Sequence, residues 1–405
     1  MRNISRRHFL KAGAALAAGA ASGFLPGLAF AAPGAYRGDV LINVFLRGGA
    51  DCLNLVVPYT ESAYYANRPS IAIAAPGSAT GAALDLDGFF GLHPSAAPLL
   101  PWFQNKALAI VHAAGSTDPS RSHFDQQDYI EFGRPGFKYN NGWVGRNLQT
   151  LGLPADIFTG VGMGSHVQKS LMGTIPPLGV SSIGSFRMPG GDALTPVMQT
   201  LYAGTDVLAQ TGAQTFAALT TMDRLRLAGY APANGAIYPA NTFGRQMANI
   251  AQMIKEDVGL AAACVDLGGW DTHDNEGGAS GTFATNVATL ADTLNALATD
   301  MGSRMGQITV VVMTEFGRRL KESASHGTDH GRGGAMLVLG GGILGGKVYG
   351  QWPGLADSAL DHGDLAVTTD FRTVLGEIVL KRLGNPAIDQ VFPGFTLQPL
   401  GLAVG

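Results

Sequence analysis

The chain has 405 residues, of which 46% are hydrophobic and only 14% are charged, so it can bury a large core and form one large domain. Its formal net charge of -3 leaves no basic field for nucleic acid, and no cationic amphipathic stretch indicates a membrane surface. The 57 glycines gather at the ends of apolar runs, which indicates turns between strands and loops.

The first 31 residues have the features of an export signal. Residues 5–11, SRRHFLK, form a twin-arginine signature, an Ala/Gly-rich stretch follows, and AFA at residues 29–31 is a small-x-small cleavage site. Glycines and a proline break the apolar stretch, so we expect no stable membrane span in the mature chain. We expect the twin-arginine machinery to export the folded protein, and residues 32–405 to be periplasmic or secreted.

Short apolar runs alternate with amphipathic patterns along the mature chain. The runs predict strands over residues 40–47, 107–113, 260–267, 307–314 and 335–340, and the patterns predict helices over 242–256 and 282–301. Strands rich in Val, Ile and Leu that alternate with helices are typical of a mainly parallel sheet covered on both faces. The predicted fold is one α/β domain, an α/β/α sandwich, in which residues 154–190 form an insertion of short strands and loops.

Carboxylates and imidazoles lie beside the ends of four predicted strands. They are Asp51 after 40–47, Asp271 and His273 after 260–267, Glu315 after 307–314, and Asp329 and His330 just before 335–340. Because the carboxyl ends of parallel strands share one edge, where ligands bind, we expect these side chains to converge. Such a group requires a cation, and its mixed oxygen and nitrogen donors suit zinc, manganese or another divalent first-row ion.

Each of these residues also has a simpler structural explanation. Asp51 would cap the turn after its strand, and Asp271 would form an Asx-turn with its neighbours. Glu315 would pair with Arg318 or Arg319. Four groups at four strand ends nevertheless favour a shared site. Five further histidines lack this pattern and are interpreted as structural or surface residues: His93, His112, His166, His326 and His362.

The two cysteines leave one disulfide open. An oxidising compartment permits a bridge between Cys52 and Cys264. Cys264 lies in an apolar run typical of a core strand, which favours a buried free thiol.

Seven motifs in a fixed order make the mature chain similar to a known family. They are RGGADCLN, RSHFDQQDY, GGWDTHDN, TEFGRR, GTDHGRGG, LGGGILGG and TTDFRTVLGEIVL. After a twin-arginine signal, they resemble the exported bacterial proteins of the domain of unknown function 1501 (DUF1501) family, which is grouped with the alkaline phosphatase superfamily. The resemblance implies an alkaline phosphatase-like α/β/α fold with a metal site that hydrolyses or transfers phosphoryl or sulfuryl groups, and implies no particular substrate.

The resemblance also implies metal ligands. Asp51 matches the superfamily's first-strand aspartate, which touches the metals. Asp271 and His273 match its Asp-and-His ligand loop with a shorter spacing, and His330, with Asp329, falls where the last histidine ligand is expected.

One position departs from the superfamily pattern. Glu315 stands at the aspartate of an Asp-His pair, and Phe316 stands where the histidine is expected. The number of metal ions, one or two, therefore stays open.

The nucleophile of the superfamily lies at the start of the helix after the second strand. Ser122 takes that place here, with Arg121 before it and His123 after it, and the N–H groups of a helix start favour a tetrahedral anion. An N-cap explains Ser122 equally well, and Ser120 and Thr117 are rival positions.

Two functions remain open from the sequence. The first is a metal-dependent hydrolase of phosphate or sulfate esters, of small molecules or polymers, in which the metal polarises the ester and Ser122 or a bound water attacks. The second is an exported binding or assembly protein that keeps the fold and part of the metal site without catalysis. The ligand-type residues favour the first function, and Phe316 favours the second.

Replacing Arg6 and Arg7 together by lysine should hold the precursor in the cytoplasm, because the export receptor reads the arginine pair itself and lysine keeps only the charge. Cell fractionation measures the outcome. Unchanged periplasmic recovery of the double variant would contradict the predicted export route.

Overall fold

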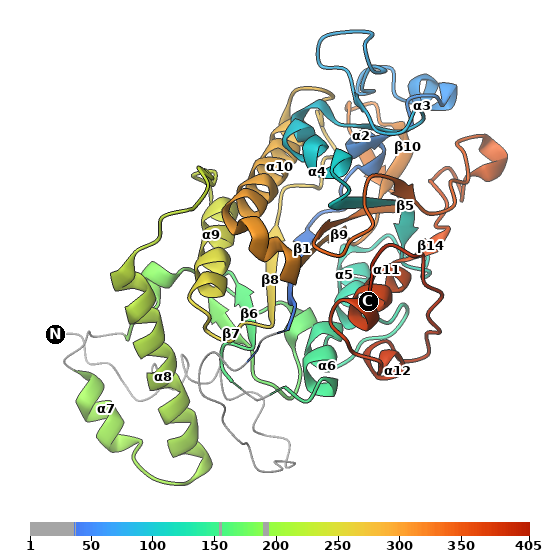
Figure 1. Cartoon of the computed structure of the whole chain (residues 1–405). Helices are drawn as coiled ribbons and strands as arrows, with labels where there is room; N and C mark the ends of the chain where they lie inside the picture. Colours follow the sequence, from blue (N-terminus) through green and yellow to red (C-terminus); the bar gives the residue numbers. More distant parts are fainter. Residues whose placement is uncertain (1–35, 37, 154–155, 189–193) are drawn as a thin grey trace.

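A computed structural model gives the fold of residues 36, 38–153, 156–188 and 194–405, so the signal segment lies outside the described residues (Figure 1). The main sheet has the strand order β13-β5-β12-β9-β1-β8-β6-β7, with β14 also paired to β5. Its strands are β1 Val40–Leu46, β5 Leu108–Gly115, β6 Gly160–Met163, β7 Leu178–Val180, β8 Ala262–Leu267, β9 Ile308–Thr314, β12 Gly334–Gly340, β13 Val348–Tyr349 and β14 Thr369–Asp370. All five predicted strands are confirmed in this sheet.

The sheet is mainly parallel, as predicted, and β12 is the exception. This strand runs antiparallel to both of its neighbours, β5 and β9. Its amino end therefore lies at the edge where β1, β5, β8 and β9 have their carboxyl ends. Residues that precede β12 reach the same edge as residues that follow the other strands.

Helices cover both faces of the sheet, which confirms the α/β class (Figure 1). One face is covered by α4 Leu100–Gln104, α8 Val207–Ala228, α9 Thr242–Lys255 and α10 Thr282–Met301. The other is covered by α5 His123–Phe132, α6 Trp143–Thr150, α11 Phe371–Lys381 and α12 Ile388–Val391. The remaining elements are α2 Cys52–Leu55, α3 Ser62–Asn67, α7 Thr195–Leu201, a small sheet of β2 Val56–Val57, β4 Gly91–Leu92 and β3 Leu84–Asp85, and a hairpin of β10 Arg318–Glu322 and β11 Thr328–His330.

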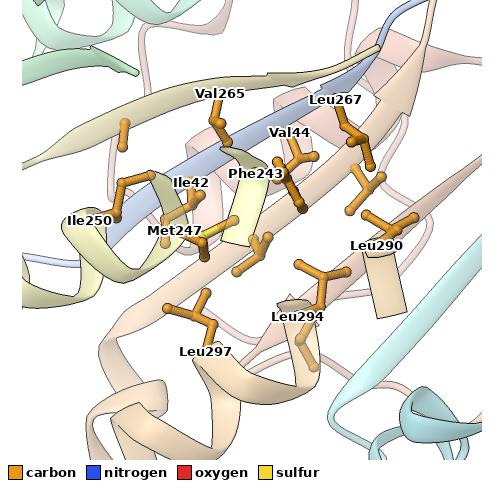
Figure 2. Close-up of a cluster of buried hydrophobic side chains, with 14 of the residues drawn as sticks. Ile42, Val44, Phe243, Met247, Ile250, Val265, Leu267, Leu290, Leu294 and Leu297 are labelled. Carbon is orange, nitrogen blue, oxygen red and sulfur yellow. The ribbon is translucent and has the colours of Figure 1, made fainter. Parts of the chain in front are cut away.

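The alternation of side chains along β1 explains why both faces are apolar. Ile42 and Val44 belong to the core under α9 and α10, and Leu41 and Phe45 belong to the core on the opposite face. Successive residues of a strand point to opposite faces, so a central strand needs apolar residues at every position. Figure 2 shows the first of these cores, in which Ile42 and Val44 lie among side chains of α9 and α10.

The helices begin and end where the sequence pattern indicates. Asn241 caps α9, because its side chain accepts a hydrogen bond from Gly244 N. Phe243, Met247 and Ile250 recur at helical spacing and are buried. The predicted helix over 282–301 coincides with α10.

The described residues of the segment 154–190 contain two short strands. Residues 154, 155, 189 and 190 lie outside the described part. These strands, β6 and β7, extend the main sheet beyond β8.

Cys52 and Cys264 are both free and buried, so the disulfide left open from the sequence is not formed. Among the residues described, no helix has both the length and the apolar character needed to cross a membrane.

Leu294→Ala should lower the free energy of unfolding by about 2–5 kcal/mol, because Leu294 is fully buried between α10 and the sheet and its loss leaves a cavity. Asp292→Ala, at an exposed position of the same helix, should change it by less than about 0.5 kcal/mol. Denaturant titration of both variants measures the difference, and equal losses would place Leu294 outside the core.

Candidate functional site

Three imidazoles meet one carboxylate at the carboxyl edge of the sheet. The Nε2 atoms of His273, His330 and His123 lie 3.0, 3.3 and 3.4 Å from Oδ1 of Asp271. Nε2 of His273 lies 2.9 Å from Nε2 of His330. Ligand atoms of His123, Asp271 and His330 all lie within 4.8 Å of one another, and Nε2 of His273 contacts the last two; we call these four residues the imidazole cluster.

The opposite nitrogen of each ring has its own oxygen partner. The Nδ1 atoms of His123, His330 and His273 lie 2.8, 2.9 and 3.3 Å from Glu315 Oε1, the Arg121 carbonyl oxygen and Asp329 Oδ1. An Nδ1–H that donates to such an oxygen leaves Nε2 with a lone pair, which is the arrangement found around metal-ligating histidines. Nε2 of His123 is buried and has no hydrogen-bond partner.

The loops that carry the cluster approach one another closely. His123 begins α5, Asp271 and His273 lie after β8, and His330 ends β11. A Cβ on Gly327 would lie 2.2 Å from the carbonyl oxygen of His273, so glycine is required where the hairpin passes this loop.

A buried arginine holds Asp271 in the ionised state. Arg318 has no exposed side-chain surface, and its guanidinium nitrogen lies 2.6 Å from Oδ1 of Asp271. Partial burial raises the pKa of Asp271, but the hydrogen bond and charge of Arg318 outweigh burial and lower it. A cation that binds at the cluster would therefore meet a carboxylate.

The pKa values of two histidines move in opposite directions. The hydrogen bond to Glu315 raises the pKa of His123, although partial burial opposes it. Burial lowers the pKa of His330, although its contact with the Arg121 carbonyl opposes this shift. One ring is thus held beside a negative charge and the other is kept neutral.

Asp51 lies in a separate buried ion pair. It forms a salt bridge with Arg68, and neither side chain has exposed surface. Its Oδ1 also accepts a hydrogen bond from Leu53 N at 3.2 Å, so Asp51 caps α2. Burial raises the pKa of Asp51, and Arg68 outweighs it and lowers the pKa. The capping role is confirmed, and a role as metal ligand stays a prediction.

Glu315 contacts the cluster through His123. Its Oε1 also accepts hydrogen bonds at 2.9 Å from Gly48 N and from Gln127 Nε2. Burial raises the pKa of Glu315, and these hydrogen bonds, with that of His123 the largest, lower it. The pairing with Arg318 or Arg319 considered from the sequence is not formed, because these arginines bind Asp271 and Asp364.

Phe316 forms one wall of the cluster. Its ring centroid lies 4.9 Å from that of His123 and 4.8 Å from that of His330. A Cβ on Gly49 would lie 2.4 Å from a ring carbon of Phe316, so only glycine leaves room for this ring. An apolar side chain thus occupies the position at which the resemblance placed a further histidine.

The predicted catalytic serine caps a helix, and the residue before it contacts the cluster through the backbone. Ser122 Oγ accepts a hydrogen bond from Asp125 N at 3.4 Å, so Ser122 is the N-cap of α5. Arg121 contacts His330 by its carbonyl oxygen, while its Nε lies 2.8 Å from Asp364 Oδ2. The nucleophilic role of Ser122 stays a prediction.

Sequence reasoning missed two residues that support the cluster and gave His123 a different role. His123 was predicted to assist catalysis, and the structure places it with the ligand-type residues. Arg318 and Gln127 were not predicted to support the cluster. The spacing of four residues between His123 and Gln127 was an available signal, because it puts both on one face of α5.

Ser122→Ala should lower the free energy of unfolding by about 1 kcal/mol, because it removes the N-cap of α5. Ser122→Asn should retain most of the stability, since asparagine caps as well as serine. Thermal or denaturant unfolding of the two variants provides the measurement. A Ser122→Ala protein as stable as the original would show that the cap contributes nothing.

Two segments of the chain match known family descriptions. Residues 3–23 match the twin-arginine translocation (TAT) pathway signal sequence, which agrees with a periplasmic or secreted protein. Residues 185–375 match the family described as protein of unknown function (DUF1501). That segment includes Asp271, His273 and His330 and leaves out His123. No curated protein matches the sequence.

Several solved structures have a distant likeness to the chain. The PsFucS1 sulfatase from Pseudoalteromonas sp. is 12% identical, with 91% of this chain and 74% of that chain covered and a TM-score of 0.41. The lipoteichoic acid synthase LtaP from Listeria monocytogenes is 10% identical, with 85% and 78% covered and a TM-score of 0.34. A protein in the alkaline phosphatase superfamily from Vibrio parahaemolyticus is 10% identical, with 85% and 71% covered and a TM-score of 0.31.

The chain carries a twin-arginine export signal, and its residues 185–375 match the DUF1501 family.

Proposed function

We propose that the protein is an exported, metal-dependent hydrolase of phosphate or sulfate esters, in which the imidazole cluster holds one divalent ion. The observation that carries the proposal is the common orientation of His123, His273 and His330. Each Nδ1 lies against an oxygen, and each Nε2 points to Asp271 Oδ1. The three Nε2 atoms lie 3.0–3.4 Å from this one carboxylate oxygen, so a cation bound among them would have nitrogen and oxygen donors on several sides.

The donors fit a first-row divalent ion. Three imidazole nitrogens and one carboxylate oxygen suit zinc or manganese better than calcium, which prefers oxygen donors alone. Such an ion, when bound, polarises the ester and lowers the pKa of water. Asp271 and His273 keep 48% and 38% of their side-chain surface exposed, so a substrate in solution can reach this side of the cluster.

The residues around the cluster have defined tasks in this proposal. Glu315 orients His123 by accepting from its Nδ1, and Arg318 keeps Asp271 ionised and in place. The first turn of α5 presents backbone N–H groups to the anionic ester. Ser122 lies at this turn, so either its hydroxyl or a water is the attacking group.

A second function, a non-catalytic exported binding or assembly protein, is favoured by two observations. Ser122 already serves as a helix cap, and Phe316 takes the place of a ligand-type residue. In this case the cluster would bind an ion that fixes the three loops and cleaves nothing. Within the first function, the activity of the Ser122→Ala variant distinguishes the Ser122 hydroxyl from a water as the attacking group. Loss of turnover with normal metal content would identify Ser122 as the nucleophile.

His273→Ala and His330→Ala should each lower the zinc content and the melting temperature of the mature protein and abolish hydrolysis of aryl phosphates or sulfates, because each removes one proposed ligand beside Asp271. His362→Ala is the matched control, since His362 is 88% exposed and lies outside the cluster. Metal analysis, thermal unfolding and an ester screen give the three readouts.

Equal metal content in all three variants would show that the ion binds elsewhere and would overturn the proposed site. A wild-type protein that carries its metal and cleaves no ester in the screen would overturn the hydrolase and leave the binding function.

A further inference from the structure

Two arginines beside the imidazole cluster share one carboxylate. Nε of Arg121 lies 2.8 Å from Oδ2 of Asp364, and Nε of Arg319 lies 3.2 Å from Oδ1 of the same residue. The side chain of Asp364 has no exposed surface, while those of Arg121 and Arg319 are 36% and 41% exposed. The carboxylate therefore lies behind the two guanidinium groups, and both of these remain open to solvent.

The charges of this group do not balance. The two guanidinium groups are always protonated, and Asp364 is the one carboxylate that forms a salt bridge with either of them among the described residues. The neighbouring Arg332 has a separate partner, since its Nη1 lies 2.5 Å from Oδ2 of Asp361. One positive charge is thus left at a partly exposed position.

Each of the two guanidinium groups also keeps a donor nitrogen free. Arg121 uses Nε and Nη2 to contact Asp364. Arg319 uses Nε for Asp364 and donates from Nη2 to the carbonyl oxygen of His362 at 2.9 Å. In the part of the chain that the structure describes, neither Nη1 atom has a hydrogen-bond partner. An anion that binds here would accept from nitrogens whose guanidinium planes are already held in place.

The turn that carries the shared carboxylate is fixed by its backbone. Asp361 N donates to the Asp364 carbonyl oxygen at 2.9 Å, and Asp364 N donates to the Asp361 carbonyl oxygen at 3.1 Å. Leu320 N, in the residue after Arg319, donates to the carbonyl oxygen of Gly363 at 3.4 Å. Because turn and hairpin are tied together, little side-chain freedom is lost when an anion binds.

The arginine pair is close to the imidazole cluster. The carbonyl oxygen of Arg121 lies 2.9 Å from Nδ1 of His330, so the Arg121 guanidinium is no farther from the cluster than the length of one arginine side chain. Arg319 follows Arg318, whose guanidinium contacts Asp271. A small molecule bound at the cluster can therefore reach the arginine pair with a second group.

We propose that Arg121 and Arg319 form a second anion-binding subsite, so that the preferred substrates are phosphate or sulfate esters that carry a further anionic group near the ester. The inference rests on the proposed function, because the imidazole cluster is taken to hold the ester that reacts. The further anionic group accepts hydrogen bonds from the two guanidinium groups and neutralises the charge that Asp364 leaves uncompensated.

The test uses binding, which does not depend on turnover. Calorimetry compares 1,3-propanediol bisphosphate with propyl phosphate, which lacks the second anion, on the zinc-loaded mature protein and its variants. Arg121→Gln and Arg319→Gln should each weaken bisphosphate binding by about three- to tenfold, the range expected for one partly exposed charged hydrogen bond, and change propyl phosphate binding much less. Arg319→Lys, which keeps the charge, should restore part of the preference.

Arg224→Gln is the matched control, because Arg224 is 54% exposed and is likewise paired with a carboxylate, that of Glu256. It should leave both affinities unchanged. A wild-type protein without preference for the bisphosphate would overturn the second subsite, and so would a preference that survives in both glutamine variants. Equal weakening of the two esters would also overturn it, since the arginines would then bind the reacting group.

The same measurements separate this inference from the proposed function. If the preference depends on Arg319 but neither ester is cleaved, the second subsite stands and the hydrolase fails. If the esters are cleaved and the preference does not depend on Arg319, the hydrolase stands and the second subsite fails.

Discussion

The buried guanidinium of Arg318 is the interaction on which the geometry of the site depends. It donates to the carbonyl oxygens of Gly48, Trp270 and Thr328 and to the carboxylate of Asp271. These acceptors belong to the loop after β1, the loop after β8 and the start of β11. A desolvated arginine requires partners for all of its donors, so the position of each loop is fixed by the same group. These segments then have one arrangement, in which His273 and His330 lie beside Asp271.

The direction of β12 explains how a helical start, a loop and a hairpin meet at one edge. Because β12 runs antiparallel to β5 and β9, the hairpin that precedes it lies at the carboxyl edge of the parallel strands. His330 then contacts the Arg121 carbonyl, which lies before α5. This contact joins residues that are far apart in the sequence, and it follows from the strand order.

The sequence predicted the elements better than it predicted the partners of the site residues. Strands such as β9 are continuous runs of Val, Ile and Thr, and α10 carries a long apolar periodicity, so local pattern was sufficient. The rule that the carboxyl ends of parallel strands share one edge also predicted that Asp271, His273 and His330 lie close together. The rule does not predict the direction in which each side chain points. Asp51 faces Arg68, a residue of the segment after α3, and no spacing in the sequence indicates that pairing.

The charge balance explains why one divalent ion suits this cluster. Asp271, Glu315 and Asp329 bring three carboxylates, and Arg318 brings the one cation that contacts the cluster directly among the described residues. Two negative charges are then left without compensation when the imidazoles are neutral, and a divalent ion neutralises them. Phe316 contributes neither charge nor donor on its side, so a second ion would have no ligand there. This charge balance supports one ion in the proposed site, where the anionic ester would meet a neutral centre flanked by the N-terminus of α5.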